Sequence, residues 1–299
     1  MIKRLRTILR FISRHPLTRE RKMNALVGFM KWQLGMKLLG GRFVVDWVDD
    51  AKFLTRKRET GLTGNLYCGF MEYEDMAFLL HYLRKSDVFY DIGANVGAYT
   101  ILASAVRGCR SHTLEPLPDT FDRLVDQLKI NRIEDLVEAK NNGVGAKADV
   151  LEFTNTLNCM NRVNTDPNNK DVTKVDVVAL DDTFEPECNS LIKIDVEGYE
   201  KFVFDGGPRF FANPNVAALI VELNDAGKKF GCIDSDIDAA IRSFGFVPVS
   251  YDPMSRAMAT LETFNDGRNT IYVRDVESAA ERCRQADKVV VHTAGDFAL

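Results

Sequence analysis

The chain has 299 residues, of which 45% are hydrophobic and 27% are charged, and its formal net charge is −4. This length allows one large domain with extensions or two small domains, and the composition is that of an ordinary globular protein. A mildly acidic chain is a poor candidate for general nucleic-acid binding. The six cysteines form no CxxC pair, which argues against a zinc site and a disulfide framework and fits a reducing compartment.

The N-terminal segment, residues 1–22, carries eight basic residues against Glu20 alone, with apolar residues at helical spacing. This pattern predicts a short basic amphipathic helix that ends near His15-Pro16. One interpretation is attachment to an anionic membrane surface or to a partner. The other is a helix packed on the body of the protein with a solvated basic face.

The location of the protein is constrained by what the sequence lacks. Arg10 divides the apolar residues of the N-terminal segment, whereas a secretion signal needs an unbroken apolar run. No stretch approaches the roughly 18 apolar residues that a membrane-spanning helix needs. We therefore expect a cytoplasmic protein, with peripheral contact at the inner membrane surface if residues 1–22 bind lipid.

The region before residue 87 predicts a mixed extension. Residues 24–40 predict a helix, and residues 42–58 predict one or two strands with a turn at Asp49-Asp50. Loops are indicated at three glycines, Gly61, Gly64 and Gly69. A further helix is predicted over residues 72–84, with apolar side chains on one side.

From residue 87 onward, predicted strands alternate with predicted helices. The strands are expected at 88–90, 111–114, 137–139, 150–153, 172–178, 191–196, 216–222, 246–251 and 269–273, and the helices at 99–106, 120–131, 199–205 and 233–244. This alternation predicts an α/β fold with a doubly wound, mostly parallel sheet. We expect three parts, which are a basic helical and β extension (1–60), the main domain (61–275), and a C-terminal helix and tail (276–299).

A glycine-containing loop connects the first predicted strand of this domain to the next helix, with the sequence Asp91-Ile92-Gly93-Ala94-Asn95-Val96-Gly97. Ligands of open α/β sheets bind at this edge, where the strands end. Gly93 has no side chain, so the backbone can turn sharply and a ligand can approach it. Gly97 is expected to let the helix pack closely on the strand.

The acidic residues around the loop favour a cationic ligand. The glycine spacing is Gly-x-x-x-Gly rather than the Gly-x-Gly-x-x-Gly of dinucleotide sites. Asp91 would repel a pyrophosphate, but it attracts the ammonium and sulfonium groups of S-adenosylmethionine. Glu115 ends the next predicted strand, where a carboxylate can accept hydrogen bonds from ribose hydroxyls. The sequence therefore predicts an S-adenosyl-L-methionine site, and a merely structural turn is the alternative.

These motifs, in this order, resemble the FkbM family of methyltransferases over about residues 65–275. The resemblance is carried by residues 88–100, 114–118 and 121, Asn131, 178–182, 191–200 and 219–222, with Tyr73-Glu74 upstream. It implies a class I, Rossmann-like fold and S-adenosylmethionine-dependent O-methylation of a hydroxyl on a sugar, a glycan or glycolipid precursor, or a related small metabolite. Asn142 and Val144 are the nearest matches in the segment after the third strand. The implied cofactor-binding residues are Asp91, Gly93, Ala94, Asn95, Gly97, Thr100, Glu115, Pro116, Asn142, Val144 and Asp195.

Acidic residues also follow the buried strand predicted over 191–196. Alternation along the strand places Lys193, Asp195 and Glu197 on one side. As catalytic residues, Asp195 or Glu197 could take the proton from an acceptor hydroxyl. As structural residues, they could pair with Lys193 or cap the next helix. A divalent metal on Asp195, Glu197 and Glu222 is conceivable chemically, but nothing in the spacing requires one, and we expect none.

Two other function classes are compatible with this fold. A nicotinamide-dependent oxidoreductase is disfavoured by the loop spacing and by Asp91. A non-catalytic protein that binds S-adenosylmethionine stays open. The expected partner is a small-molecule or glycan acceptor and not a nucleic acid, because the basic residues cluster at the N-terminus.

Overall fold

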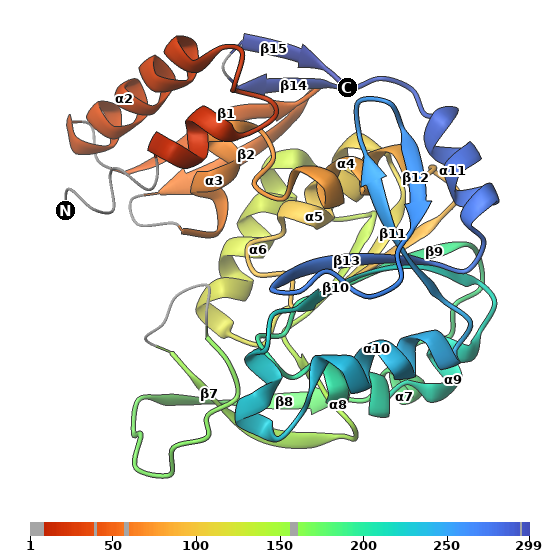
Figure 1. Cartoon of the computed structure of the whole chain (residues 1–299). Helices are drawn as coiled ribbons and strands as arrows, with labels where there is room; N and C mark the ends of the chain where they lie inside the picture. The colour runs from red at the N-terminus through yellow and green to blue at the C-terminus, as the bar shows by residue number, and fades with distance from the viewer. Residues whose placement is uncertain (1–8, 39–40, 57–59, 156–160, 294) are drawn as a thin grey trace.

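The structure is a computed structural model that describes residues 9–38, 41–56, 60–155, 161–293 and 295–299. Its central feature is an eight-stranded sheet with the strand order β12-β11-β13-β10-β9-β3-β4-β5 (Figure 1). The strands are β3 (Val88–Ile92), β4 (Arg110–Leu114), β5 (Val137–Lys140), β9 (Ser190–Ile194), β10 (Val216–Leu223), β11 (Val247–Asp252), β12 (Ala257–Thr260) and β13 (Arg268–Val273).

The predicted doubly wound, mostly parallel sheet is confirmed. Strands β5, β4, β3, β9 and β10 run parallel, and β13 lies antiparallel between β10 and β11. This order is that of the class I methyltransferase fold, with β12 added as an edge strand that the sequence did not predict. All residues of β3 and β9 are buried, as expected for parallel strands covered on both faces. Asp91 and Lys193 are the charged residues in these two strands.

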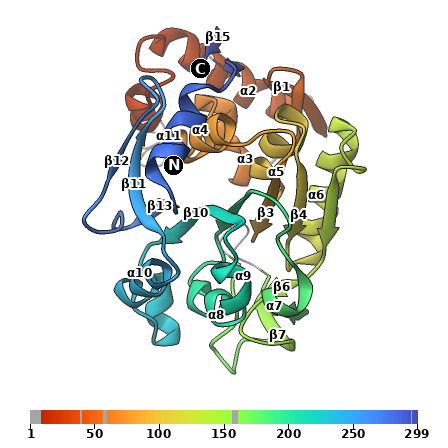
Figure 2. The same cartoon turned by 90° about the vertical axis from the view of Figure 1, so that its right-hand side faces the viewer.

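Helices cover both faces of the sheet (Figures 1 and 2). One face carries α4 (Tyr73–Tyr82), α5 (Ala98–Ile101), the π-helical turn η1 (Leu102–Val106), α6 (Pro118–Asn131) and α11 (Val276–Arg284). The other face carries α7 (Leu180–Thr183), α8 (Glu200–Asp205), α9 (Pro208–Ala212) and α10 (Asp234–Ser243). Each face has its own hydrophobic core, with Phe89 in the first and Ile92 in the second, because neighbouring residues of a strand point to opposite faces.

A small second sheet has the order β6-β8-β7. It consists of β6 (Gly143–Val144), β7 (Asp149–Thr154) and β8 (Val172–Val178). The strands predicted over 150–153 and 172–178 are therefore present, but they pair with each other in antiparallel register and not with the central sheet.

The two ends of the chain meet in a third sheet, β15-β14-β1-β2. It consists of β1 (Arg42–Val48), β2 (Ala51–Arg56), β14 (Val290–Thr293) and β15 (Gly295–Ala298). The hairpin predicted over 42–58 is confirmed, with its turn at Asp49-Asp50. The sequence predicted only a helix and a tail after residue 276, whereas β14 pairs with β1 and so joins the end of the chain to its beginning.

The loop predicted around Gly61, Gly64 and Gly69 was wrong in its first part. Residues 60–68 form α3 (Thr60–Cys68), which follows α2 (Lys22–Leu38). Glycine has a low helix propensity, but it suits this position of the helix, because a Cβ on Gly64 would lie only 2.6 Å from the Met71 Sδ. Only Gly69, with a φ of +85°, lies beyond the end of the helix.

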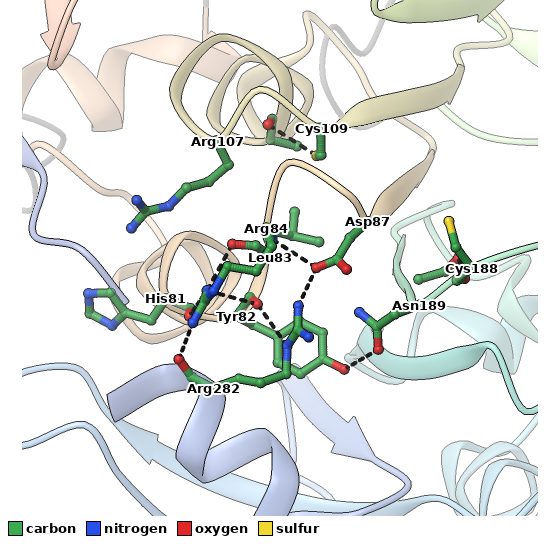
Figure 3. A network of polar contacts seen from close by, with 12 residues as sticks. His81, Tyr82, Leu83, Arg84, Asp87, Arg107, Cys109, Cys188, Asn189 and Arg282 are labelled. Carbon is green, nitrogen blue, oxygen red and sulfur yellow. Dashed lines mark hydrogen bonds and ion pairs between the residues drawn. The ribbon is translucent and has the colours of Figure 1, made fainter. Parts of the chain in front are cut away.

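A polar network fixes α11 to the end of α4 (Figure 3). Asp87, which is 4% exposed, forms an ion pair with Arg282 and accepts a hydrogen bond of 2.8 Å from the backbone N–H of Arg84. Arg282 also donates to the carbonyl of Tyr82 (3.2 Å). The network joins residues 195 positions apart in the sequence and lies away from the carboxyl ends of the strands, where ligands of this fold class bind.

Candidate functional site

A cavity of about 260 Å³ lies at the carboxyl ends of the parallel strands. Ten of the residues singled out from the sequence line it, namely Asp91, Gly93, Ala94, Asn95, Glu115, Pro116, Asn142, Val144, Asp195 and Glu197. Two others, Gly97 and Thr100, do not line it. The cavity is therefore built from three loops, which follow β3, β4 and β9, and from the segment around β6.

Gly93 is the point at which the loops after β3 and β9 touch. Its φ is +83°, a conformation that favours glycine. A Cβ at this position would lie 1.9 Å from the backbone oxygen of Asp195. The missing side chain thus allows two backbones of the protein to approach each other, in addition to any role toward a ligand.

Gly97, with a φ of +81°, comes just before α5. A Cβ there would lie 2.4 Å from Leu124 Cδ1 on α6. The missing side chain therefore leaves room for α6 beside the start of α5. Helix α5 also lies against β3.

Asp91 is held at the end of β3 by Thr100. The Asp91 carboxylate is 1% exposed and accepts hydrogen bonds from the Thr100 N–H (3.1 Å) and hydroxyl (2.6 Å). Burial raises the pKa of Asp91 to about 6, although Thr100 and Lys193 act in the opposite direction. Thr100 therefore lies behind the cavity wall and orients Asp91, which is part of that wall.

Glu115 is anchored by two backbone amides. Its two carboxylate oxygens accept hydrogen bonds from the N–H groups of Asn95 (2.9 Å) and Leu117 (3.0 Å). Burial raises the pKa of Glu115 to about 8, and the two amides lower it only in part. These contacts tie the glycine loop to the loop after β4 and fix the carboxyl group at the cavity wall, where the sequence placed a ribose contact.

Lys193 lies at the centre of the acidic wall. Its side chain is 2% exposed, and Nζ lies 3.0 Å from Asp195 Oδ2 and 5.4 Å from the centre of the Tyr99 ring. Burial opposes the charged form of Lys193, but the neighbouring carboxylates of Asp195, Glu72 and Glu222 outweigh burial and raise its pKa. The lysine is therefore a permanent cation that is already paired.

Upstream residues complete this wall, and sequence reasoning did not identify them as site residues. Glu72, just before α4, accepts hydrogen bonds from the Tyr99 hydroxyl (2.7 Å) and from Asn269 Nδ2 (2.9 Å). Asn269 also donates to Asp75 (3.0 Å). The resemblance at Tyr73-Glu74 was the available signal for this region, but it did not indicate that the preceding glutamate lines the cavity.

The loop after β9 differs from the predicted strand. The strand ends at Ile194, and Glu197 has a φ of +55°, which is uncommon outside glycine. Strand alternation therefore does not orient Glu197. Instead, the buried Glu200 carboxylate accepts hydrogen bonds from the N–H groups of Val196 (3.2 Å) and Gly198 (3.1 Å) and holds the loop in this shape.

Two buried polar atoms of the lining residues have no hydrogen-bond partner among the described residues. They are Asn65 Nδ2 on α3 and Glu222 Oε2 at the end of β10. The Asn65 Oδ1 accepts the Met71 N–H (2.6 Å), so the amide NH2 is the unpaired side. Burial and the nearby Asp195 raise the pKa of Glu222 to about 9. An unpaired buried polar atom is costly, so the Asn65 amide is suited to contact a bound molecule, whereas a protonated Glu222 can donate a hydrogen bond to the neighbouring Asp195.

The profile of the FkbM methyltransferase domain matches residues 91–248, which is more than half of the chain. The chain belongs to the FkbM methyltransferase family. The matched region begins at Asp91 and contains the glycine loop, Glu115 and the acidic loop after β9. Membership of this family confirms the resemblance that the sequence motifs indicated, and it identifies S-adenosyl-L-methionine as the cofactor.

Among individual proteins, the chain is similar to the hexuronic acid methyltransferase AglP of Haloferax volcanii, with 26% identity over 156 residues. The match spans 51% of this chain and 62% of that protein. Similar solved structures include a precorrin-6y C5,15-methyltransferase from Geobacter metallireducens (13% identity, 74% of this chain and 92% of that chain, TM-score 0.40). An rRNA methylase from Streptococcus thermophilus is also similar (14% identity, 66% and 91%, TM-score 0.38).

The acidic lining of the cavity in this FkbM family member suits the positive charges of S-adenosyl-L-methionine. The described lining residues include six carboxyl groups, those of Glu72, Asp91, Glu115, Asp195, Glu197 and Glu222, against the single amine of Lys193. The ammonium and sulfonium groups of the cofactor are favourable in such surroundings, whereas a pyrophosphate is not. Asp91, Gly93 and Glu115 are the residues that we expect to hold it, with Asn142 and Val144 on the adenine side.

Proposed function

We propose that the protein methylates a hydroxyl oxygen of a sugar or a sugar-containing small molecule. The observation that carries the proposal is the position of Asp195. Its backbone touches Gly93 of the cofactor loop, while its carboxylate is held by Lys193 and lines the same cavity. A carboxylate at this point lies beside both the expected cofactor residues and the remaining, acidic part of the cavity.

Asp195 has the chemistry of a proton acceptor. When bound, the cofactor would supply a methyl group on a positively charged sulfur, which would leave as a neutral thioether when the carbon–sulfur bond breaks. Asp195 would accept the proton of the acceptor hydroxyl that receives the methyl group, and Lys193 holds the carboxylate in place. Positioning contributes much of the rate of such a displacement. Glu197, half-buried on the next turn of the loop, is suited to orient the acceptor by a hydrogen bond.

The charge of the cavity bears on the acceptor class. The name of the relative AglP specifies a hexuronic acid, which supports a sugar as the acceptor. In this chain, however, the one lysine among the described lining residues is already paired with Asp195. A uronate would add a further carboxylate with no cation to meet it. We therefore infer that a neutral or amino sugar is preferred over a uronic acid.

The experiment is a methyl-transfer assay with labelled S-adenosylmethionine and matched hexose, hexosamine and hexuronate glycosides. Asp195→Asn is expected to retain cofactor affinity, measured by calorimetry, while turnover falls by roughly 100- to 10,000-fold, the range for a lost general base. Asp205→Asn is the matched control, because Asp205 pairs with Lys201 on the exposed side of α8 and outside the cavity.

Three results would contradict parts of this proposal. Normal turnover in Asp195→Asn would remove this residue from the mechanism. Preferred methylation of the hexuronate would overturn the acceptor class. Tight cofactor binding without transfer to any acceptor would favour a non-catalytic binding protein.

A further inference from the structure

Helix α2 has two apolar faces on opposite sides. Ala25, Phe29 and Trp32 face inward and pack with Ile12 and Tyr67. The opposite side carries an apolar stripe, defined by Met23, Val27, Met30, Leu34 and Leu38, whose members are between 45% and 71% exposed. Their spacing of three or four residues places them along one line of the helix. A surface helix normally has polar residues on its outer face, so this stripe indicates an interaction site.

The charge around the stripe is strongly positive. Helix α2 contains no acidic residue, and its Lys22 and Lys31 are exposed. Residues 1–42 together contain eleven Lys and Arg against Glu20 alone, although the whole chain is net negative. Figure 1 shows α2 at the periphery of the molecule. An exposed apolar stripe beside concentrated positive charge matches the surface of an anionic lipid bilayer.

The first helical segment has a different role from α2. Within residues 9–14, Ile12 is fully buried and Leu9 packs against the same cluster, so the described part of the predicted amphipathic face points into the protein. This packing favours the second interpretation of that segment, a packed helix with a solvated basic face. Residues 1–8 lie outside the described residues. The exposed Arg10, Arg14 and Arg19 can therefore contribute positive charge at a membrane surface. The apolar side chains that could insert into the membrane are those of α2.

We propose that α2 docks in the plane of an anionic membrane surface, with the apolar stripe inserted at the boundary between head groups and acyl chains. None of the described helices has the length and apolar character of a membrane span. A second copy of this chain is a poorer occupant, because pairing two stripes would bring the exposed Lys22 and Lys31 of both copies together.

Helix α3 connects α2 to the cavity. Gln33 on α2 donates a hydrogen bond to the Tyr67 hydroxyl (2.9 Å), and Phe29 packs edge-on against the Tyr67 ring at 4.9 Å between centroids. The same helix α3 carries Asn65, whose unpaired amide belongs to the cavity wall. A membrane-bound α2 would therefore help to hold α3 in place, on the side of the cavity that Asn65 and Glu72 line.

The test is co-sedimentation of the full chain with vesicles. Vesicles of phosphatidylcholine alone are compared with vesicles of equal parts phosphatidylcholine and phosphatidylglycerol. The wild type is expected to bind the anionic vesicles, and Met30→Asp/Leu34→Asp is expected to weaken binding by roughly tenfold or more, since two inserted apolar side chains become charged. Met254→Asp/Val150→Asp is the matched control, because these side chains are also exposed, by 62% and 56%, but lie elsewhere.

Melting temperatures and vesicle binding together distinguish membrane docking from misfolding and from dimerisation. All four changed side chains are exposed, so the melting temperature is expected to stay unchanged, and its measurement checks that each variant is folded. Failure of the wild type to bind anionic vesicles, or equal binding by the two double variants, would overturn the proposal. So would a dimer in analytical ultracentrifugation that the stripe variant abolishes while vesicle binding is absent. None of these results depends on methyl transfer.

Discussion

At the scale of single residues, the buried Glu115 of the cavity contributes to how the stability of the ligand-free protein depends on pH. Glu115 has a raised pKa of about 8 in the folded chain, against 4.5 as its ordinary value. Between these two pH values, the folded protein holds a proton that the unfolded chain has released. The free energy of unfolding therefore falls as the pH rises through this window, and a cationic ligand would relieve part of that cost.

Glu115→Gln is expected to flatten this dependence, because glutamine does not titrate. Urea unfolding of the ligand-free protein is measured at about pH 5 and at about pH 8. Between these values, the free energy of unfolding should fall by on the order of 2 kcal/mol more in the wild type than in Glu115→Gln. Glu281→Gln is the control, because hydrogen bonds from Arg284 and Gln285 lower the pKa of Glu281 and move its titration below the window. Identical slopes in the wild type and Glu115→Gln would contradict the assignment.

At the scale of elements, the site depends on how closely the ends of β3 and β9 approach each other. Gly93 and Gly231 both have a left-handed backbone, with φ values of +83° and +75°. A Cβ on Gly93 would lie 1.9 Å from a backbone oxygen, whereas a Cβ on Gly231 would meet nothing within 4 Å. The two glycines therefore share the conformational requirement but differ in the packing requirement.

Substituting alanine at each glycine separates these two requirements. Gly231→Ala should destabilise the protein by about 1–2 kcal/mol, the cost of the left-handed conformation. Gly93→Ala should cost at least about 2 kcal/mol more, because a backbone oxygen in a packed core cannot move aside cheaply. Denaturant unfolding of both variants measures the difference. Equal costs would show that the two loops can separate, and that Gly93 serves only the turn.

At the scale of the whole molecule, the network around Asp87 holds the C-terminal helix to the body. Arg282 is 28% exposed and pairs with the buried Asp87, whereas Arg284, two residues later on α11, is 54% exposed and pairs with the exposed Glu281. The two arginines have the same chemistry but differ in burial, which decides what an ion pair contributes.

Arg282→Met is expected to destabilise the protein by about 2–4 kcal/mol, because Asp87 is left buried without its partner. Arg284→Met should change stability by no more than about 0.5 kcal/mol. The double variant Arg282→Met/Asp87→Asn should recover part of the loss, since no unpaired charge stays buried. Thermal and urea unfolding measure all three variants. A double variant less stable than Arg282→Met would contradict the attribution of the loss to an unpaired buried charge.

Most strands and helices of the main domain can be predicted from the sequence alone, and so can the loop that ends β3; the edge strand β12 and the helix α3 cannot. These predictions are possible because hydrophobic periodicity, glycines and acidic residues at strand ends are local signals. The sequence also placed Asp91, Glu115 and Asp195 at strand ends, and parallel strands bring their carboxyl ends to the same edge. These three residues line one cavity in the structure.

The residues that complete the cavity and the surfaces that stay exposed could not be predicted from the sequence. Glu72 and Asn65 reach the cavity from elements before the first parallel strand, and β14 joins β1 across most of the chain. Helix α2 has apolar residues on several sides, so its sequence cannot show which side packs. Such contacts depend on side chains that are distant in the sequence, and the pattern within any one element is the same whichever neighbour it meets.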